Sequence, residues 1–228
     1  MRSNIMVSAI LLAAGRGRRL NSYVCKPLVK VGARPLVFYS LRTLNAHPAI
    51  AEIVVVVNRA NRKAIADIVS KHSFGKVKAL VLGGLRRQDS VYNGLRAVEG
   101  KSKLVLIHDS ARPFVDPRSV TKVIREAGIY GAAILAVKPR ATIKSSCPDN
   151  TVAQTFDRDK LWEIQTPQVF KKEIILEAFK KYSREPVTDD ASLVERLGKR
   201  VKIVEGSYKN IKITTNEDLL WAKNIKQA

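Results

Sequence analysis

The feature that most constrains this chain is an apolar run near its beginning that breaks into glycines and arginines. Segment 9–20 reads Ala-Ile-Leu-Leu-Ala-Ala-Gly-Arg-Gly-Arg-Arg-Leu, and Lys26 follows six residues after Leu20. Such an apolar run predicts a buried strand. Gly15 and Gly17 let the backbone turn tightly and bring N–H groups close to an anion, while the arginines and Lys26 supply positive charge. The sequence therefore predicts a phosphate-binding loop at the end of a buried strand.

Two well-known phosphate loops do not fit this segment. Leu20 stands where a dinucleotide-binding fingerprint has its third glycine, which disfavours a hydride-transferring enzyme. No Gly-Lys-Ser or Gly-Lys-Thr follows a glycine-rich loop, so the P-loop nucleotide hydrolases are disfavoured as well. A third kind of phosphate loop remains.

Apolar runs recur along the chain and alternate with amphipathic segments of helical spacing. The runs are 7–13, 53–57, 77–82, 104–107 and 132–137, and the helical segments are 35–46, 59–72, 88–99 and 117–129. Asp116 is expected to cap the last of these helices, with Pro117 in its first turn. The alternation predicts an α/β fold with a Rossmann-like, mostly parallel sheet of buried strands, covered by helices on both faces.

The pattern changes after residue 137. Segments 141–144 and 151–156 are short, β-prone and mostly polar, and Cys147 to Asn150 form a turn-like sequence between them. We expect a protruding β-hairpin arm over 139–165. Two uncovered strands are marginal in water, so the arm is expected to be covered by a partner subunit.

The rest of the chain completes the sheet and its helices. Helices are expected over 172–182, 190–197 and 215–225, and a strand over 201–205. Thr214 or Thr215 is expected to cap the closing helix. Without a repeat or a linker, residues 1–228 are expected to form a single domain.

Cysteine content and the length of the apolar runs indicate in which cell compartment the chain works. The two cysteines, Cys25 and Cys147, are too few for a disulfide framework. The apolar runs are far shorter than the roughly 20 residues that span a bilayer, and no start resembling a signal peptide precedes the first of them. We therefore expect a cytoplasmic protein without a membrane segment.

The histidines do not suggest a metal site. His47, His72 and His108 have no metal-ligand spacing, so zinc is not expected. We expect His47 and His72 at the surface, near helix ends.

The chain is strongly basic. It carries 41 Lys and Arg against 20 Asp and Glu, a formal charge of +21, which steers phosphorylated ligands toward it. A nucleic-acid-binding protein is therefore an alternative from another class. Only 6% of the residues are aromatic, no RNA-recognition motif or zinc finger occurs, and the basic residues are spread along the whole length. These features disfavour specific nucleic-acid binding.

Ordered motifs connect the chain with a known family. Segment 12–20, with Lys26-Pro-Leu-Val-Lys-Val-Gly and Arg34-Pro-Leu after it, resembles the signature of the sugar-phosphate nucleotidyltransferases. Later motifs narrow the resemblance to the family of cytidylyltransferases that act on 2-C-methyl-D-erythritol 4-phosphate. They are Gly83-Gly-Leu-Arg-Arg-Gln-Asp-Ser-Val, His108-Asp-Ser-Ala-Arg-Pro, Gln165-Thr-Pro-Gln, Thr188-Asp-Asp-Ala-Ser and Asn210-Ile-Lys-Ile-Thr.

The resemblance implies a reaction, a metal and a partner. A sugar-phosphate oxygen attacks the α-phosphorus of CTP and magnesium pyrophosphate leaves, in the pathway to isoprenoid precursors that does not use mevalonate. The cofactor is Mg²⁺, and the arm joins a homodimer. The enzymatic alternative is a ribitol 5-phosphate cytidylyltransferase, which shares the fold and CTP.

Family positions also imply residue roles. The catalytic group comprises Arg19, Lys26, Arg158 and Lys212. The nucleotide-binding group comprises Ala13, Ala14, Gly15, Arg16, Gly17, Gly83, Gly84, Arg87, Ser90, Asp109 and Ser110. The acceptor-binding group comprises Asp109, Arg112, Thr142, Arg158, Thr166, Thr188 and Lys212, with Thr142 and Arg158 expected to serve the neighbour's site. Asp109 is also the expected metal ligand, because it follows an apolar run and so lies at the carboxyl end of a parallel strand.

The chain departs from the family pattern at three points. Cys25-Lys26-Pro27 stands where Pro-Lys-Gln is usual, Leu85 replaces an Asp, and Ala141 replaces an Asp before Thr142. The loss of a polar group at Leu85 predicts a less strict choice of nucleotide.

Overall fold

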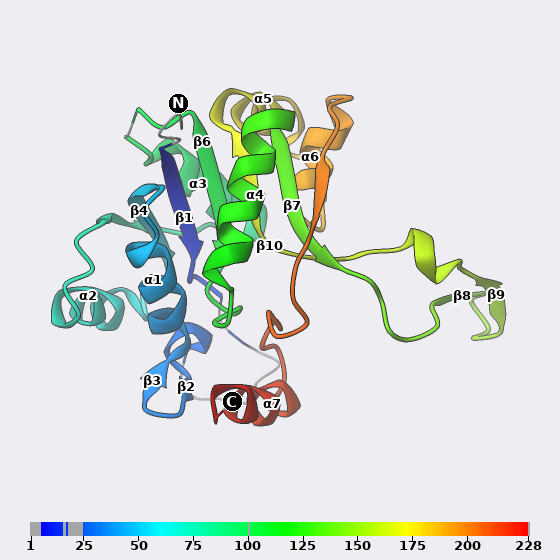
Figure 1. Cartoon of the computed structure of the whole chain (residues 1–228), viewed down its shortest axis with the longest axis horizontal. Helices are drawn as coiled ribbons and strands as arrows, with labels where there is room; N and C mark the ends of the chain where they lie inside the picture. Colours follow the sequence, from blue (N-terminus) through cyan, green and yellow to red (C-terminus); the bar gives the residue numbers. More distant parts are fainter. Residues whose placement is uncertain (1–5, 16, 18–24, 100, 228) are drawn as a thin grey trace.

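A seven-stranded sheet forms the centre of the protein (Figure 1). The computed structural model describes residues 6–15, 17, 25–99 and 101–227. The strand order is β11-β7-β10-β6-β1-β4-β5. Its strands are β1 Val7–Leu12, β4 Ile50–Val57, β5 Val77–Leu82, β6 Leu104–Asp109, β7 Ala132–Val137, β10 Glu163–Lys171 and β11 Lys202–Glu205. Only β10 pairs antiparallel with its neighbours in this sheet, which confirms the predicted mostly parallel architecture.

Helices connect the strands, close to the predicted ranges. They are α1 Leu36–Ala46, α2 Arg62–Lys71, α3 Arg87–Arg96, α4 Pro117–Tyr130, α5 Lys172–Tyr182, α6 Ala191–Arg196 and α7 Asn216–Gln227. The predicted cap of α4 is confirmed, because the Asp116 carboxylate accepts a hydrogen bond from the N–H of Arg118 at 2.9 Å. At α7 the Thr215 hydroxyl accepts from the N–H of Asp218 at 3.3 Å.

Alternate residues of each strand pack on opposite faces of the sheet. On β1, Val7, Ala9 and Leu11 pack with α1 and α4, whereas Ile10 packs with α3 and α5. These side chains are fully buried, and each buried Val, Leu or Ile side chain contributes roughly 1.5–3 kcal/mol. Both faces are therefore covered by helices, as the continuous apolar runs predicted.

Strand β5 differs from the prediction of a buried strand. It lies at the edge of the sheet and pairs with β4 on one side, and its residues are half-buried or exposed, none of them fully buried. An edge strand has one free side, so an apolar run there does not require full burial.

Strand β10 was missed in the sequence. Its segment Gln165-Thr-Pro-Gln168 is polar and contains a proline, yet Gln165 and Gln168 are buried. The polar groups find partners: Gln165 Nε2 donates to the Ser207 carbonyl at 3.0 Å, and Gln168 Nε2 donates to Asp189 Oδ2 at 2.8 Å. Because buried polar groups are tolerated when they are hydrogen-bonded, hydrophobic periodicity could not find this strand.

The predicted hairpin arm is present and projects away from the sheet (Figure 1). Strands β8 Lys144–Ser146 and β9 Val152–Thr155 pair antiparallel, and the short helix η3 Arg158–Lys160 follows them. Ile143, Val152 and Phe156 are exposed on the arm. At its base, the Lys138 ammonium lies 4.0 Å from the centre of the Trp162 ring, and the Arg140 guanidinium lies 3.8 Å from that of Tyr208. These cation–π contacts hold the arm to the body.

Smaller elements complete the fold. The helix η2 Lys26–Leu28 precedes a two-stranded ribbon of β2 Lys30–Val31 and β3 Arg34–Pro35, and α7 packs near β2. In the described part of the chain, no helix is both long enough and apolar enough to cross a membrane.

The expectation for His47 was wrong, because this side chain is only 5% exposed. Its Nδ1 accepts from the N–H of Ala49 at 3.3 Å, so in the neutral ring Nε2 donates to the Thr121 hydroxyl at 3.0 Å. Burial, together with the nearby charge of Lys76, lowers the pKa of His47 below its ordinary value. The imidazole joins α1 to α4 in its neutral form.

We expect His47 to make the stability of the fold depend on pH. In the unfolded chain His47 takes up a proton near pH 6.5, whereas its lowered pKa in the folded chain opposes protonation. The free energy of unfolding therefore falls as the pH drops below this value, by at most about 1.4 kcal/mol per pH unit for one proton. Urea unfolding from about pH 7.5 to about pH 5 should give a smaller slope for His47→Gln than for the unsubstituted chain. Equal slopes would contradict a neutral, buried His47.

Candidate active site

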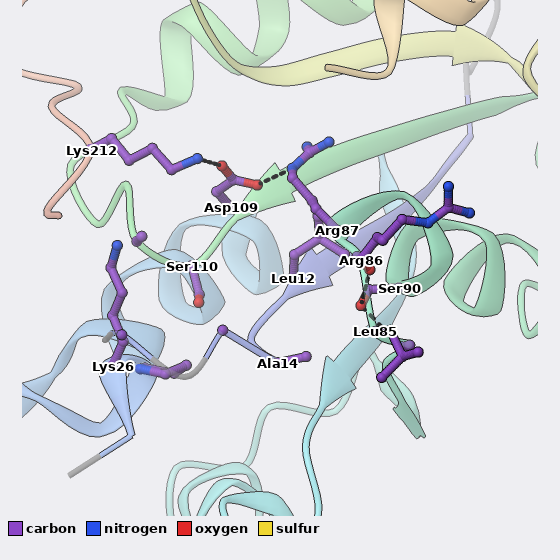
Figure 2. A pocket seen from close by; sticks show the side chains of 15 residues that line it. Leu12, Ala14, Lys26, Leu85, Arg86, Arg87, Ser90, Asp109, Ser110 and Lys212 are labelled. Atoms are coloured by element: carbon purple, nitrogen blue, oxygen red, sulfur yellow. Dashed lines mark hydrogen bonds and ion pairs between the residues drawn. The ribbon is translucent and has the colours of Figure 1, made fainter. Parts of the chain in front are cut away.

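The carboxyl-terminal ends of β1 and β6 and the loop after β5 surround one cavity of about 570 Å³ (Figure 2). Ligands of open α/β sheets bind at this edge. The cavity is lined by Leu12, Ala14, Gly15, Gly17, Lys26, Pro27, Gly84, Leu85, Arg86, Arg87, Ser90, Asp109, Ser110, Ala111 and Lys212. Leu12 pairs with Asp109 in the sheet register, so the parallel pairing of β1 with β6 brings the first loop beside the carboxylate.

The first loop brings Lys26 close to the backbone. Gly17 has φ +69°, and a Cβ at this position would lie 2.7 Å from the Cβ of Lys26. Only glycine allows both this backbone conformation and this approach. Gly17 therefore lets Lys26, at the start of η2, lie against the loop. Arg16 and Arg19 lie outside the described residues.

The second loop follows β5 and lies against the first. The N–H of Gly83 donates to the Val57 carbonyl at 2.8 Å, and the N–H of Gly84 donates to the Ser90 hydroxyl at 3.1 Å. A Cβ on Gly83 would come within 2.7 Å of the Cβ of Ala14 and of Ser90 Oγ. The two glycine loops are thus in direct contact. Leu85 is fully exposed, at the rim of the cavity.

Asp109 is at the centre of the charged groups in the cavity (Figure 2). Its Oδ1 lies 3.2 Å from Arg87 Nε, and its Oδ2 lies 2.6 Å from Lys212 Nζ. Arg87 Nη2 also lies 2.9 Å from Oδ2 of Asp190, which is almost fully buried. A lysine from the segment before α7, an arginine from α3 and a carboxylate from β6 are therefore fixed relative to one another.

These contacts determine the ionisation of the site. Burial acts to raise the pKa of Asp109, but the charges of Arg87 and Lys212 outweigh it and lower that pKa well below its ordinary value. Burial likewise acts to lower the pKa of Arg87, and the two carboxylates beside it outweigh this and raise it. Both groups stay charged at neutral pH.

A buried hydrogen-bond network holds the backbone of Asp109 in place. Thr166 Oγ1 accepts from the N–H of Asp109 at 3.0 Å and lies 3.0 Å from His108 Nδ1. His108 Nε2 lies 3.1 Å from the Arg112 carbonyl and donates to it, so Nδ1 accepts from the Thr166 hydroxyl. Burial lowers the pKa of His108 to about 4, which keeps the ring neutral and this pattern intact.

The cavity brings together most of the residues proposed for the nucleotide. Of the predicted nucleotide-binding group it contains Ala14, Gly15, Gly17, Gly84, Arg87, Ser90, Asp109 and Ser110. Of the predicted catalytic group it contains Lys26 and Lys212. Ala13 is buried behind the first loop, and Gly83 adjoins the cavity through its contact with Ala14.

The predicted acceptor-binding residues lie partly elsewhere. Arg112 donates from Nη1 to the Asn210 carbonyl at 2.7 Å and from Nη2 to that of Ile164 at 3.1 Å, beside the cavity. Thr142, Arg158 and Thr188 are exposed and do not line the cavity of their own chain. Arg158 Nη1 instead donates to the Arg140 carbonyl at 3.2 Å, at the base of the arm.

Several cavity residues were not singled out from the sequence as site residues. Leu12, Pro27, Arg86 and Ala111 line the cavity, and Asp190 pairs with Arg87 from outside it. Asp190 lies in the 188–192 motif, so its acidic character was a usable signal. The other four are sequence neighbours of predicted residues, and no motif in the sequence marks their side chains as site residues.

Among the described residues, no group of three or more histidine, cysteine, aspartate or glutamate side chains could hold a metal ion. Asp109 is the only carboxylate among the described residues that line the cavity. Mg²⁺ is commonly bound by one or two carboxylates together with substrate phosphates and water. The residues therefore fit Mg²⁺ when phosphate oxygens supply most of its ligands.

Comparisons with known proteins point to one family. The family model of 2-C-methyl-D-erythritol 4-phosphate cytidylyltransferase matches residues 7–227. A protein of that description from Shouchella clausii (strain KSM-K16) is 47% identical over 220 residues, covering 96% of this chain and 95% of the relative. One from Geobacillus kaustophilus (strain HTA426) is also 47% identical, over 219 residues, covering 95% of each chain.

A solved structure shows the same likeness. The crystal structure of 4-diphosphocytidyl-2C-methyl-D-erythritol synthase from Anaerococcus prevotii DSM 20548 matches with a TM-score of 0.88 at 36% identity, over 99% of this chain and 97% of that one. Because sequence and structure agree over nearly the whole length, this chain belongs to the 2-C-methyl-D-erythritol 4-phosphate cytidylyltransferase family.

Proposed function

We propose that this chain transfers the cytidylyl group of CTP to 2-C-methyl-D-erythritol 4-phosphate in the biosynthesis of isoprenoid precursors. The products are pyrophosphate and 4-diphosphocytidyl-2-C-methyl-D-erythritol. The observation that carries the proposal is that Lys26, Lys212 and Arg87 converge with two glycine loops on one cavity, in a chain of this family. Such a cavity suits a triphosphate.

The reaction is a displacement at phosphorus. A phosphate oxygen of the acceptor forms a bond to the α-phosphorus, and the bond from the α-phosphorus to the bridging oxygen of the β-phosphate breaks. The nucleophile is already an anion, so no general base is needed. Catalysis then rests on positioning and on stabilising the charge that develops on phosphate oxygens.

The first loop holds the triphosphate. Lys26 lies against Gly17 at the edge of the cavity and places its positive charge beside the transferred group. The N–H groups of Ala14 and Gly15 add neutral donors. By family position Arg16 and Arg19 contribute further charge.

Asp109 and Lys212 connect the nucleotide with the acceptor. Asp109 would hold Mg²⁺, which neutralises charge on the phosphate oxygens of CTP when bound. Lys212 and Arg87 keep the carboxylate ionised and oriented for this role. Lys212 also reaches the phosphate of the acceptor.

The second loop reads the base and ribose. Gly83, Gly84 and Ser90 lie beside Ala14, and Gly84, Ser90 and Ser110 line the cavity with it. Leu85 presents only apolar surface at the rim, so selection of cytosine rests on backbone groups.

The acceptor site is completed by a second subunit. Arg112, Thr166 and Thr188 belong to the body of the chain, whereas Thr142 and Arg158 are carried by the arm, whose apolar side chains are exposed in one chain. A homodimer in which each arm serves the neighbour's cavity would cover them. The free cysteines Cys25 and Cys147 suit the reducing cytoplasm.

The acceptor assay tests the proposed reaction directly. Pyrophosphate release should occur with CTP and 2-C-methyl-D-erythritol 4-phosphate, and should be much slower with ribitol 5-phosphate, whose longer polyol needs different hydroxyl partners. Omission of Mg²⁺ should abolish release. Faster turnover with ribitol 5-phosphate, or no turnover with either acceptor alongside tight nucleic-acid binding, would contradict the proposal.

Loss of the Lys26 charge should lower kcat. Removing one preorganised electrostatic contact costs roughly 3–4 kcal/mol of barrier, so Lys26→Ala should reduce kcat by about 10²–10³-fold. The matched control is Lys30→Ala, since Lys30 is exposed on β2 and does not line the cavity. Both variants should unfold at the same temperature as the unsubstituted chain. A folded Lys26→Ala variant with unchanged turnover would remove Lys26 from the mechanism.

Mixing two inactive variants tests the shared site. Lys26→Ala and Arg158→Ala should each be nearly inactive, and subunit exchange should give heterodimers with one intact site. For random pairing this restores about a quarter of the original activity. If exchange occurs and no activity returns, Arg158 does not act in the neighbour's cavity.

A further inference from the structure

Two asparagines that follow β4 bind the backbone of the first glycine loop. Asn61, which is fully buried, donates from Nδ2 to the Ala13 carbonyl at 2.8 Å. Asn58, which is half-buried, donates from Nδ2 to the Ala14 carbonyl at 3.1 Å. Consecutive carbonyls of the loop are therefore held from the same side.

The two side chains also fix each other. The N–H of Asn58 donates to Asn61 Oδ1 at 2.9 Å, and the N–H of Asn61 donates to Asn58 Oδ1 at 2.9 Å. Because each Oδ1 is used in this way, each Nδ2 must face the loop. We call this pair the Asn58–Asn61 clasp.

The clasp is not explained by the helix that follows it. Asn61 is the N-cap residue of α2, but its side chain makes no capping hydrogen bond. Asn58 Nδ2 also lies 3.9 Å from Cys25 Sγ, just before Lys26. The clasp therefore contacts the loop on both sides of the arginine-rich segment: Ala13 and Ala14 before it, and Cys25 after it.

The clasp fixes the direction of two N–H groups. In a trans peptide the C=O and the following N–H point in opposite directions. With the Ala13 and Ala14 carbonyls turned to the asparagines, the N–H groups of Ala14 and Gly15 point away from them. Among the described residues neither N–H has an acceptor, and both residues line the cavity.

We infer that Asn58 and Asn61 are positioning residues for CTP, which aim the N–H groups of Ala14 and Gly15 at its phosphates. This inference rests on the proposed function. A loop that contains Gly15 and Gly17 can rotate its peptide planes at little cost, and a rotated plane would present a carbonyl to the phosphates. Holding the donors in place before the nucleotide arrives removes that cost from binding.

The test separates nucleotide binding from general stability. Asn58→Ala should raise the Kd and KM for CTP by about 3- to 10-fold, the value of one hydrogen bond, and leave the KM for 2-C-methyl-D-erythritol 4-phosphate within about twofold. The matched control is Asn45→Ala. Asn45 lies at the end of α1, where its Oδ1 accepts from the N–H of Lys76 at 3.1 Å. It should lower only the melting temperature.

A second variant keeps the test decisive if Asn58→Ala unfolds. Asn58→Asp retains the acceptor for the N–H of Asn61 and loses the Nδ2 donor that faces Ala14 and Cys25, so it should weaken CTP binding at both low and high salt. A weakening that disappears at high salt would reflect the added charge and overturn the inference. Unchanged CTP binding in either folded variant, or an equal change in both KM values, would also overturn it.

Failure of the clasp and failure of the proposed site give different results. If Lys26→Ala loses turnover while Asn58→Ala binds CTP normally, the site stands and the clasp has no role in nucleotide binding. If Lys26→Ala keeps full turnover, the proposed site itself is wrong.

Discussion

The site depends on the ion pairs that hold Asp109. A buried carboxylate loses its hydration, and isolated burial of the charge would cost several kcal/mol. Arg87 and Lys212 replace that hydration with contacts of 3.2 and 2.6 Å, and Asp190 balances the second side of Arg87. Four charged groups from four separate segments are thereby fixed at the end of β6. Removal of Arg87 would leave the buried Asp190 without its ion-pair partner, and Asp109 with Lys212 alone.

Backbone geometry complements this charge. Gly17 and Gly83 bring Lys26 and the second loop within contact of the first, and asparagine amides hold the loop's carbonyls away from the cavity. Positive side chains attract a triphosphate from any direction, but only fixed N–H donors define where each phosphate lies. The cationic side chains attract the triphosphate and the N–H groups of the glycine loops place it, which is why the site contains both.

The arm exposes apolar side chains instead of burying them in its own chain. Its strands pair only with each other, and its apolar side chains Ile143, Val152 and Phe156 are exposed. Cation–π contacts at Trp162 and Tyr208 give it a defined base on the body. A segment that is anchored at one end and apolar at the other is suited to cover, and be covered by, another subunit.

The sequence by itself determined the alternation of strands and helices and the phosphate loop, because continuous apolar runs, Gly15, Gly17 and Lys26 carry strong local patterns. Most of the other residues that line the cavity followed from the family resemblance of the ordered motifs. It did not reveal β10 or the burial of His47, since both rely on hydrogen-bond partners far away in the chain. Only the tertiary structure decided that Asp190 joins Arg87, that Thr166 supports Asp109, and that Asn58 and Asn61 orient the loop. Asn58 and Asn61 reach the loop because β4 pairs with β1, and Thr166 reaches Asp109 because β10 pairs with β6. Asp190 and Arg87 come from two further segments, and no local pattern encodes which side chains the fold brings together.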